Sequence, residues 1–236
     1  MKFLRKLHKW TGLVIGIQVL LWVVSGLVMS LLDPEKVSGR QWVDEPHHLD
    51  QMTPAGDILE PDQLPVNRFS DVLSLSLELD QGVPVYRVRH ADGVNIINAI
   101  NGAVLVFNEQ DAGLLAHQDF AGNGDIRDIE AGVAPDLETR GNRGPYWRVN
   151  FTDQASTSIY VSASTGDILA RRNSYWRVFD IFWMLHIMDY SGHEDLNNLL
   201  VIIVSLVSFW LGLSGFILLF GSFKRSDFSS LTRFVN

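Results

Sequence analysis

The stretch LVIGIQVLLWVVSGLVMSLL at residues 13–32 holds 15 apolar side chains in 20 positions and no charged one. A second stretch, LLVIIVSLVSFWLGLSGFILLF at residues 199–220, runs for 22 positions without a charge. A helix of about 20 apolar residues crosses the roughly 30 Å hydrocarbon core of a bilayer, so each stretch predicts a transmembrane helix. The two stretches therefore exclude an ordinary soluble enzyme.

The charges predict how the chain lies across the membrane. Lys2, Arg5, Lys6 and Lys9 precede the first stretch, whereas residues 33–198 carry 12 basic and 26 acidic groups. Because Lys and Arg collect in cytoplasmic flanks, we expect both termini in the cytoplasm and residues 33–198 mainly in the periplasm of a bacterial inner membrane. An acidic domain of this kind is a poor partner for nucleic acid.

The first stretch has an alternative interpretation as a cleaved secretory signal. Its apolar run exceeds the roughly 7 to 15 residues of such a signal, and no A-x-A-like site follows before Asp33. We therefore interpret it as an uncleaved anchor. The chain contains no cysteine, which excludes disulfides and covalent haem attachment through C-x-x-C-H.

The segment between the two stretches has the alternating pattern of β-strands. Leucines at 73, 75, 77 and 79 alternate with polar residues, which predicts a half-buried strand. The pair Asn101-Gly102 lies between two apolar runs and favours a type I′ hairpin. We expect a meander of strands over 72–107, helices over 58–69 and 109–119, and a loop over 121–145.

A second copy of this pattern follows about 61–64 residues later. WRVNF at 147–151 matches YRVRH at 86–90, and IYVSASTGDILARR at 159–172 matches IINAINGAVLVF, with Gly166 in the place of Gly102. The short connections between strands predict an antiparallel sheet. The chain is therefore expected to be an α+β membrane protein whose exported α/β domain is built twice.

His8 lies just before the first apolar stretch, and Gly12 and Gly16 follow it at spacings of four. All three share one helix face, where small residues leave a trough for a flat tetrapyrrole or for a second helix. The second stretch carries a similar stripe of small residues at 205, 208, 212 and 215. Two such faces on a chain with two spans predict a homodimer whose spans form a four-helix bundle.

Two more histidines stand near the other end of the spans. His186 lies in the apolar and aromatic segment at 175–190, and His193 follows a break at Ser191-Gly192. An ionisable side chain at membrane depth is a candidate functional residue. The alternative is that each imidazole simply hydrogen-bonds to backbone or to lipid headgroups.

The opening LHKWTGLVIG (7–16) resembles the start of PepSY-associated transmembrane proteins, and FWMLHIM with FWLGLSGFILLF resembles their closing region. The tandem hairpins that end in NGAVLVF and TGDILARR resemble the two PepSY repeats. The resemblance covers nearly the whole chain. It divides the chain into an N-terminus with the first span (1–32), a PepSY-like domain (33–174, repeats 58–108 and 109–172), an interfacial helix with the second span (175–222) and a tail (223–236).

The resemblance also implies a function. Family members of this size include haem-dependent ferric reductases that assist ferrous-iron uptake, and their haem-ligating histidines fall on His8 and His186 here. Larger members have more spans and histidines in one chain, so the second ligand would come from a dimer partner or from His193. The implied cofactor is haem b, the substrate is ferric iron or a ferric chelate, and a ferrous-iron transporter is a partner. Electron transfer of this kind requires no catalytic acid, base or nucleophile.

Another group of residues suits a metal ion directly. Asp44, Glu45, His47 and His48 combine carboxylates and imidazoles soon after the first span, although a solvated polar loop is the favoured explanation of these residues. They leave open a metal-binding accessory subunit of a transporter. A third possibility is a non-enzymatic membrane-tethered PepSY module that binds or restrains a periplasmic protein. His90 and His117 are expected to be structural.

Overall fold

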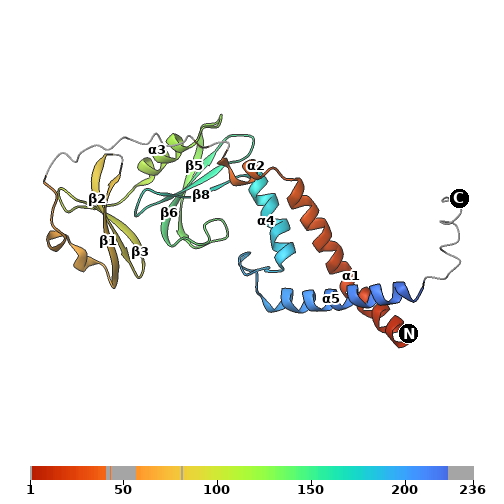
Figure 1. Ribbon diagram of the computed structural model, residues 1–236. Helices are drawn as coiled ribbons and strands as arrows, with labels where there is room; N and C mark the ends of the chain where they lie inside the picture. Colours follow the sequence, from red (N-terminus) through yellow and green to blue (C-terminus); the bar gives the residue numbers. More distant parts are fainter. Residues whose placement is uncertain (1, 41–42, 44–56, 81, 223–236) are drawn as a thin grey trace, which may run out of the picture. The chain divides into compact units, whose positions relative to one another are not determined.

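The computed structural model describes residues 2–40, 43, 57–80 and 82–222 (Figure 1). The chain divides into two compact units. One unit comprises Met1–Leu31 with Phe179–Asn236, and the other comprises Leu32–Val178. The first contains the apolar helices and the second contains the sheets, so the chain is an α+β protein as expected.

The first unit contains two helices that are long and apolar enough to span a membrane. They are α1 (Lys2–Leu31) and α5 (Leu199–Phe220), with mean hydropathies of 2.3 and 2.4 over their most apolar windows. Few of their side chains are buried within the chain, as expected for helices surrounded by lipid. Asn198 caps α5 by accepting a hydrogen bond from the Val201 amide. The unit also contains α4 (Ser174–Ile187) from Phe179 onward.

The second unit contains two antiparallel sheets of four strands each. In each sheet the strands lie in the order in which they occur along the chain, which confirms the predicted meander. The first sheet consists of β1 (Val72–Asp80), β2 (Val83–His90), β3 (Gly93–Asn98) and β4 (Val104–Leu105). The second consists of β5 (Ile126–Ala134), β6 (Gly144–Phe151), β7 (Ser158–Ser162) and β8 (Ile168–Arg172).

The strand registers confirm the duplication. Tyr86 pairs with Ile97 in the first sheet, and Trp147 pairs with Val161 at the matching position of the second. Both sheets also shift register directly after the first pair of their edge strands, at Val72 and at Ile126. A shared bulge at the same place indicates two copies of one unit, because register irregularities are specific features of a sheet.

The turns that close the β3 and β7 hairpins are alike, but they are not the predicted type I′ turns. Gly102 and Gly166 have φ of +72° and +73°, and each amide bonds to the carbonyl four residues earlier. Asn101 does not have positive φ. A type I′ turn needs positive φ at both central residues, so the prediction for this turn was wrong and only the glycine position was right.

We predict that Gly166→Ala destabilises the protein more than Gly141→Ala. A left-handed conformation costs a non-glycine residue about 1–2 kcal/mol at either position. At Gly166 a Cβ would also lie 2.7 Å from the Phe107 ring, whereas no described atom lies within 4 Å of a Cβ at Gly141. Thermal unfolding followed by circular dichroism measures the difference. Equal shifts would contradict the contact with Phe107.

Three expectations for local structure meet different outcomes. The predicted helix over 109–119 is confirmed as α3 (Glu109–Asp119), with Asn108 as its N-cap. Residues 58–69 form two short 3₁₀ turns instead of a helix, because Pro61 and Pro65 interrupt the backbone hydrogen bonds. The loop expected over 121–145 contains β5, whose nine residues are held by pairing with β6 rather than by a strong pattern of their own.

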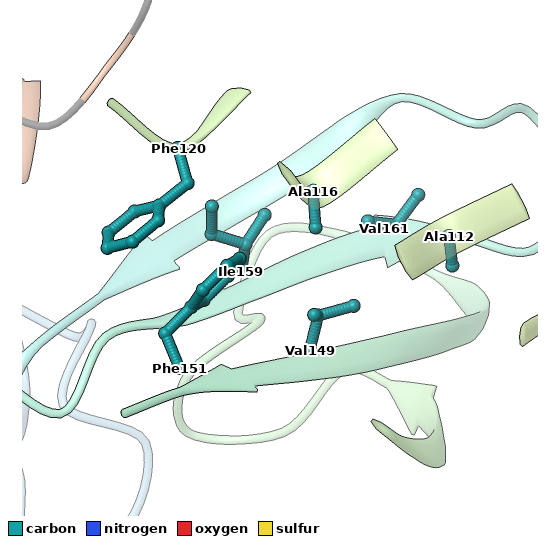
Figure 2. Close-up of a cluster of buried hydrophobic side chains, with 7 residues drawn as sticks. All are labelled: Ala112, Ala116, Phe120, Val149, Phe151, Ile159 and Val161. Atoms are coloured by element: carbon teal, nitrogen blue, oxygen red, sulfur yellow. The ribbon is translucent and has the colours of Figure 1, made fainter. Parts of the chain in front are cut away.

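Small residues let α3 lie close to the second sheet. Ala112 and Ala116 of α3 are fully buried against apolar side chains of β6 and β7, and Figure 2 shows this cluster. The other members are Phe120, Val149, Phe151, Ile159 and Val161. The first sheet has its own cluster, centred on Tyr86, Val88 and Ile97. Each repeat therefore has a separate core.

The leucine face of β1 is less buried than its alternation predicts. Leu75 packs against the core of the first repeat, but Leu73 is 69% exposed and Leu77 is 48% exposed. The reason is position, since β1 is the edge strand of its sheet. Alternation identified the strand correctly but overestimated how far the core reaches.

Candidate functional site

His8, near the start of α1, contacts a serine and a glycine of α5. Its Nδ1 lies 2.8 Å from Oγ of Ser214, which is 2% exposed. Gly215 lies beside the imidazole, and a Cβ added there would be 3.1 Å from Cε1 of the ring. The absence of a side chain at Gly215 therefore makes room for the ring.

His186, at the end of α4, makes the same kind of contact with α1. Its Nδ1 lies 3.0 Å from Oγ of Ser25, which is 1% exposed. A Cβ added to Gly26 would be 3.5 Å from Cε1 of the imidazole. The indole of Trp22 donates a hydrogen bond to the His186 carbonyl. We call the two arrangements, His8 with Ser214-Gly215 and His186 with Ser25-Gly26, the histidine clamps.

The tautomer of each histidine depends on the direction of the serine hydroxyl beside it. Each hydroxyl has one hydrogen, and each serine oxygen also lies within hydrogen-bond distance of a carbonyl in its own helix, 3.1 Å for Ser25 to Trp22 and 3.0 Å for Ser214 to Leu211. If the hydroxyl donates to that carbonyl, its oxygen accepts from Nδ1–H of the histidine. In that arrangement the proton lies on Nδ1 and the lone pair on Nε2.

This tautomer is the one that ligates a metal through Nε2. Histidine ligands of metals commonly donate their other N–H to an acceptor, which fixes the ring and makes it a stronger ligand. Among the described residues, neither Nε2 of His8 nor that of His186 has a hydrogen-bond partner. An imidazole held in this way could supply one of the two ligands of a haem iron.

The two histidine clamps lie far apart along α1. His8 and Ser25 are 17 positions apart, which corresponds to about 25 Å at 1.5 Å per residue. That distance approaches the roughly 30 Å thickness of the hydrocarbon core. His8 lies five positions before the apolar stretch at 13–32 and Ser25 lies seven positions before its end, so the two clamps lie at different depths along α1.

His193 contacts a residue that the sequence analysis did not identify. Its Nδ1 lies 2.7 Å from Oδ2 of Asp180, and both side chains are buried. The Trp183 indole donates to the His193 carbonyl. A carboxylate in the middle of the aromatic segment at 175–190, with apolar residues on both sides, was the signal that could have identified Asp180. The structure brings His193 to this carboxylate and not to either clamp.

The loop after α4 is organised by Asp189. Its carboxylate accepts backbone hydrogen bonds from Gly192, Glu194 and Asp195 and a hydroxyl bond from Ser191. Hydrogen bonds from the Asp195, Gly192 and Glu194 amides, and then from the Ser191 hydroxyl, hold the pKa of Asp189 well below its usual range. The connection from His186 to α5 is therefore fixed by an ionised side chain.

The two glycines that follow His8 have different surroundings. A Cβ at Gly12 would be 3.6 Å from Leu211 of α5, whereas no described atom lies within 4 Å of one at Gly16. The face predicted as a trough is therefore partly covered by α5 of the same chain. A groove of about 280 Å³ lies between α1 and α5 and is lined by Leu7, Thr11, Leu206, Val207 and Trp210.

The remaining candidate residues divide into two groups. Asp44, Glu45, His47 and His48 lie outside the described residues, so their role in metal binding stays a prediction. The described part of the chain has no group of three or more His, Asp or Glu side chains that could hold a metal ion. His90 bonds to Asn95 and stacks on Phe69, and His117 is exposed on α3, as expected for structural residues.

Comparison with known proteins identifies one family. The model of the family described as PepSY-associated TM region matches residues 5–235. No curated protein and no solved structure matches the chain. The family match includes both apolar helices and both repeats.

Proposed function

We propose that this chain, which belongs to the PepSY-associated TM region family, binds haem b and passes electrons across the bacterial inner membrane to ferric iron. The histidine clamps are the observation that carries the proposal. Each holds one imidazole by Nδ1 on a buried serine and leaves Nε2 as a ligand. In this role the protein is a haem-dependent ferric reductase that supports ferrous-iron uptake.

The residues of the chain have distinct tasks in this function. His8 and His186 would hold the haem irons, and Ser214 and Ser25 fix the orientation of the two rings. A haem iron with two imidazole ligands would supply reversible one-electron transfer without an open position for oxygen. The apolar surfaces of α1 and α5 exclude water from the path between the two clamps.

The function proposed here requires a second copy of the chain. Each clamp presents a single imidazole, and the two clamps are too far apart along α1 to ligate one iron. A homodimer supplies the second ligand at each level by placing two copies of α1 and α5 in a four-helix bundle. The basic flank at residues 2–9 orients both termini toward the cytoplasm, so that electrons leave on the periplasmic side.

An absorption spectrum of detergent-purified protein tests the proposal directly. Protein from haem-replete cells is expected to have a Soret band that shifts when dithionite is added and shifts back when ferric iron is supplied. Colourless protein would contradict the proposal. It would instead agree with a non-enzymatic PepSY module that binds a periplasmic protein.

The serines of the clamps make a separate prediction. Ser25→Ala or Ser214→Ala removes the acceptor of Nδ1–H and makes the imidazole a weaker ligand of ferric iron. We expect haem affinity to fall by about 10- to 100-fold and the reduction potential of the retained haem to rise. Redox titration and haem content per chain measure both effects.

The chain offers a matched control for each serine. Ser30 also donates to a carbonyl three residues earlier in α1, but it is exposed and touches no histidine. Ser205 is exposed on α5. Ser30→Ala and Ser205→Ala should leave affinity and potential unchanged. Equal effects in the control variants and the clamp variants would contradict the role assigned to Ser25 and Ser214.

A further inference from the structure

A polar cleft of about 470 Å³ lies between the two repeats of the second unit. Arg87 and Arg89 of β2 line it from the first repeat, and Arg143, in the loop before β6, lines it from the second. His90 and Asn142 also contribute to its walls. Three guanidinium groups from two repeats therefore border one cavity.

Arg87 is held in place by carboxylates. Its guanidinium donates to Asp167 at 2.7 and 3.3 Å and to Glu78 at 2.9 Å. The hydrogen bond to Asp167, followed by that to Glu78, outweighs partial burial and raises the pKa of Arg87 above its usual range. Arg87 thus connects the two repeats as a fixed cation whose charge is already balanced.

Arg89 and Arg143 differ from Arg87 in this respect. Neither has a hydrogen bond or an ion pair with any residue that the structure describes, and both are exposed at the cleft. Their positive charges are therefore available to a ligand. Arginine presents a planar fork of donors that matches a carboxylate.

The basic character of this cleft is not a consequence of composition. Residues 33–198 carry 26 acidic and only 12 basic groups, and the neighbouring cleft of about 450 Å³ is lined by Asp80, Asp111 and Asp167. Asp167 borders both clefts and pairs with Arg87, which lines only the basic one. An acidic domain that gathers unpaired arginines at one cavity has a local site for anions.

We propose that this basic cleft binds a small anion that carries two or more carboxylate groups. Arg89 and Arg143 come from different repeats, so a ligand with separate carboxylates can contact both, whereas a single compact anion contacts one arginine better than the other. The identity of the physiological ligand rests on the proposed function, under which the ligand would be a ferric carboxylate chelate. The binding site itself does not depend on haem.

Isothermal titration of the full-length protein in detergent with metal-free citrate tests the site. Binding is expected to weaken at least about 10-fold in the double variant Arg89→Gln with Arg143→Gln, because two charge-assisted contacts are lost. Arg127→Gln is the matched control, because Arg127 is exposed on β5, pairs with Asp128 and does not line the cleft. Thermal unfolding of each variant verifies that the fold is retained.

Each other outcome overturns the proposal. If the unaltered protein does not bind citrate, the proposed site does not exist. If the double variant binds citrate as tightly as the unaltered protein, the two arginines do not form the site. Tighter binding of pyrophosphate than of citrate assigns the cleft to phosphates instead of carboxylates.

The same variants separate this proposal from that of the ferric reductase. Metal-free citrate is expected to bind whether or not the protein contains haem. Colourless protein that binds citrate would therefore support the anion site and contradict only the redox function. In red protein, the double variant should still be reoxidised by an uncharged ferric chelate at an unchanged rate, but more slowly by ferric citrate. Equal slowing with both chelates would contradict the cleft as the site for anions.

Discussion

The His186→Ala variant is expected to lose all electron transfer to ferric iron while it keeps about half of the haem. The two clamps are about 25 Å apart along α1, so they cannot both ligate one iron and each clamp would hold a separate haem. Removing the imidazole of one clamp should remove the haem at that clamp from the dimer and leave the haem at the other clamp. The electron path then has a gap that transfer cannot cross at a useful rate.

The His8→Ala variant should give the same result from the other end of the membrane. The double variant is expected to contain no haem. The pyridine haemochrome assay gives haem per chain, and ferrous iron trapped by a chromogenic chelator gives activity. His117→Ala is the control, because His117 is exposed on α3 and lies in neither clamp. Full activity in the double variant would rule out both clamps as haem sites.

Local sequence patterns were sufficient to predict the two long apolar helices and most of the duplicated strands. The apolar runs that became α1 and α5 are too long for any other common structure, and the alternation at 83–90 and 144–151 has a period that only a strand satisfies. Glycine at 102 and 166 identified the hairpin positions, because few other residues accept positive φ. These signals are local, so a sequence displays them directly.

The partners of the histidines could not be predicted in the same way. Ser214 is 206 positions from His8, and Ser25 is 161 positions from His186, so no local pattern connects them. The sequence contains a Ser-Gly pair in each span, and Gly215 was assigned to a small-residue stripe, but neither pair was connected with a histidine. Only the packing of the helices indicates that each pair receives an imidazole.

The errors in the second unit have the same origin. The strand β5 lies in a segment rich in residues that favour loops, and its pairing with β6 overrides that preference. The leucines of β1 alternate as a buried strand does, yet the edge of the sheet leaves Leu73 and Leu77 exposed. In both cases the tertiary environment decides what the local pattern cannot.

The Gly215→Leu variant is expected to lose haem from the His8 level as completely as His8→Ala does, although no ligand is removed. A Cβ at position 215 would already lie 3.1 Å from Cε1 of the imidazole, and the remaining leucine atoms would occupy the space of the ring. Interior packing is dense, so the ring has to rotate away from Ser214 and its Nε2 no longer points to the same place.

Gly212→Leu provides the matched control on the same helix. Gly212 is exposed, and no described atom lies within 4 Å of a Cβ placed there. The same increase in side-chain volume should therefore leave the contact between His8 and Ser214 within the chain intact, and the oligomeric state, measured alongside, shows whether any loss of haem comes from the contact between subunits. Haem per chain and the reduction potential of each variant distinguish the two positions. If Gly212→Leu lost haem while Gly215→Leu kept it, the small residues of α5 would serve contact between subunits and not the seating of His8, and the geometry of the clamp would have no functional role.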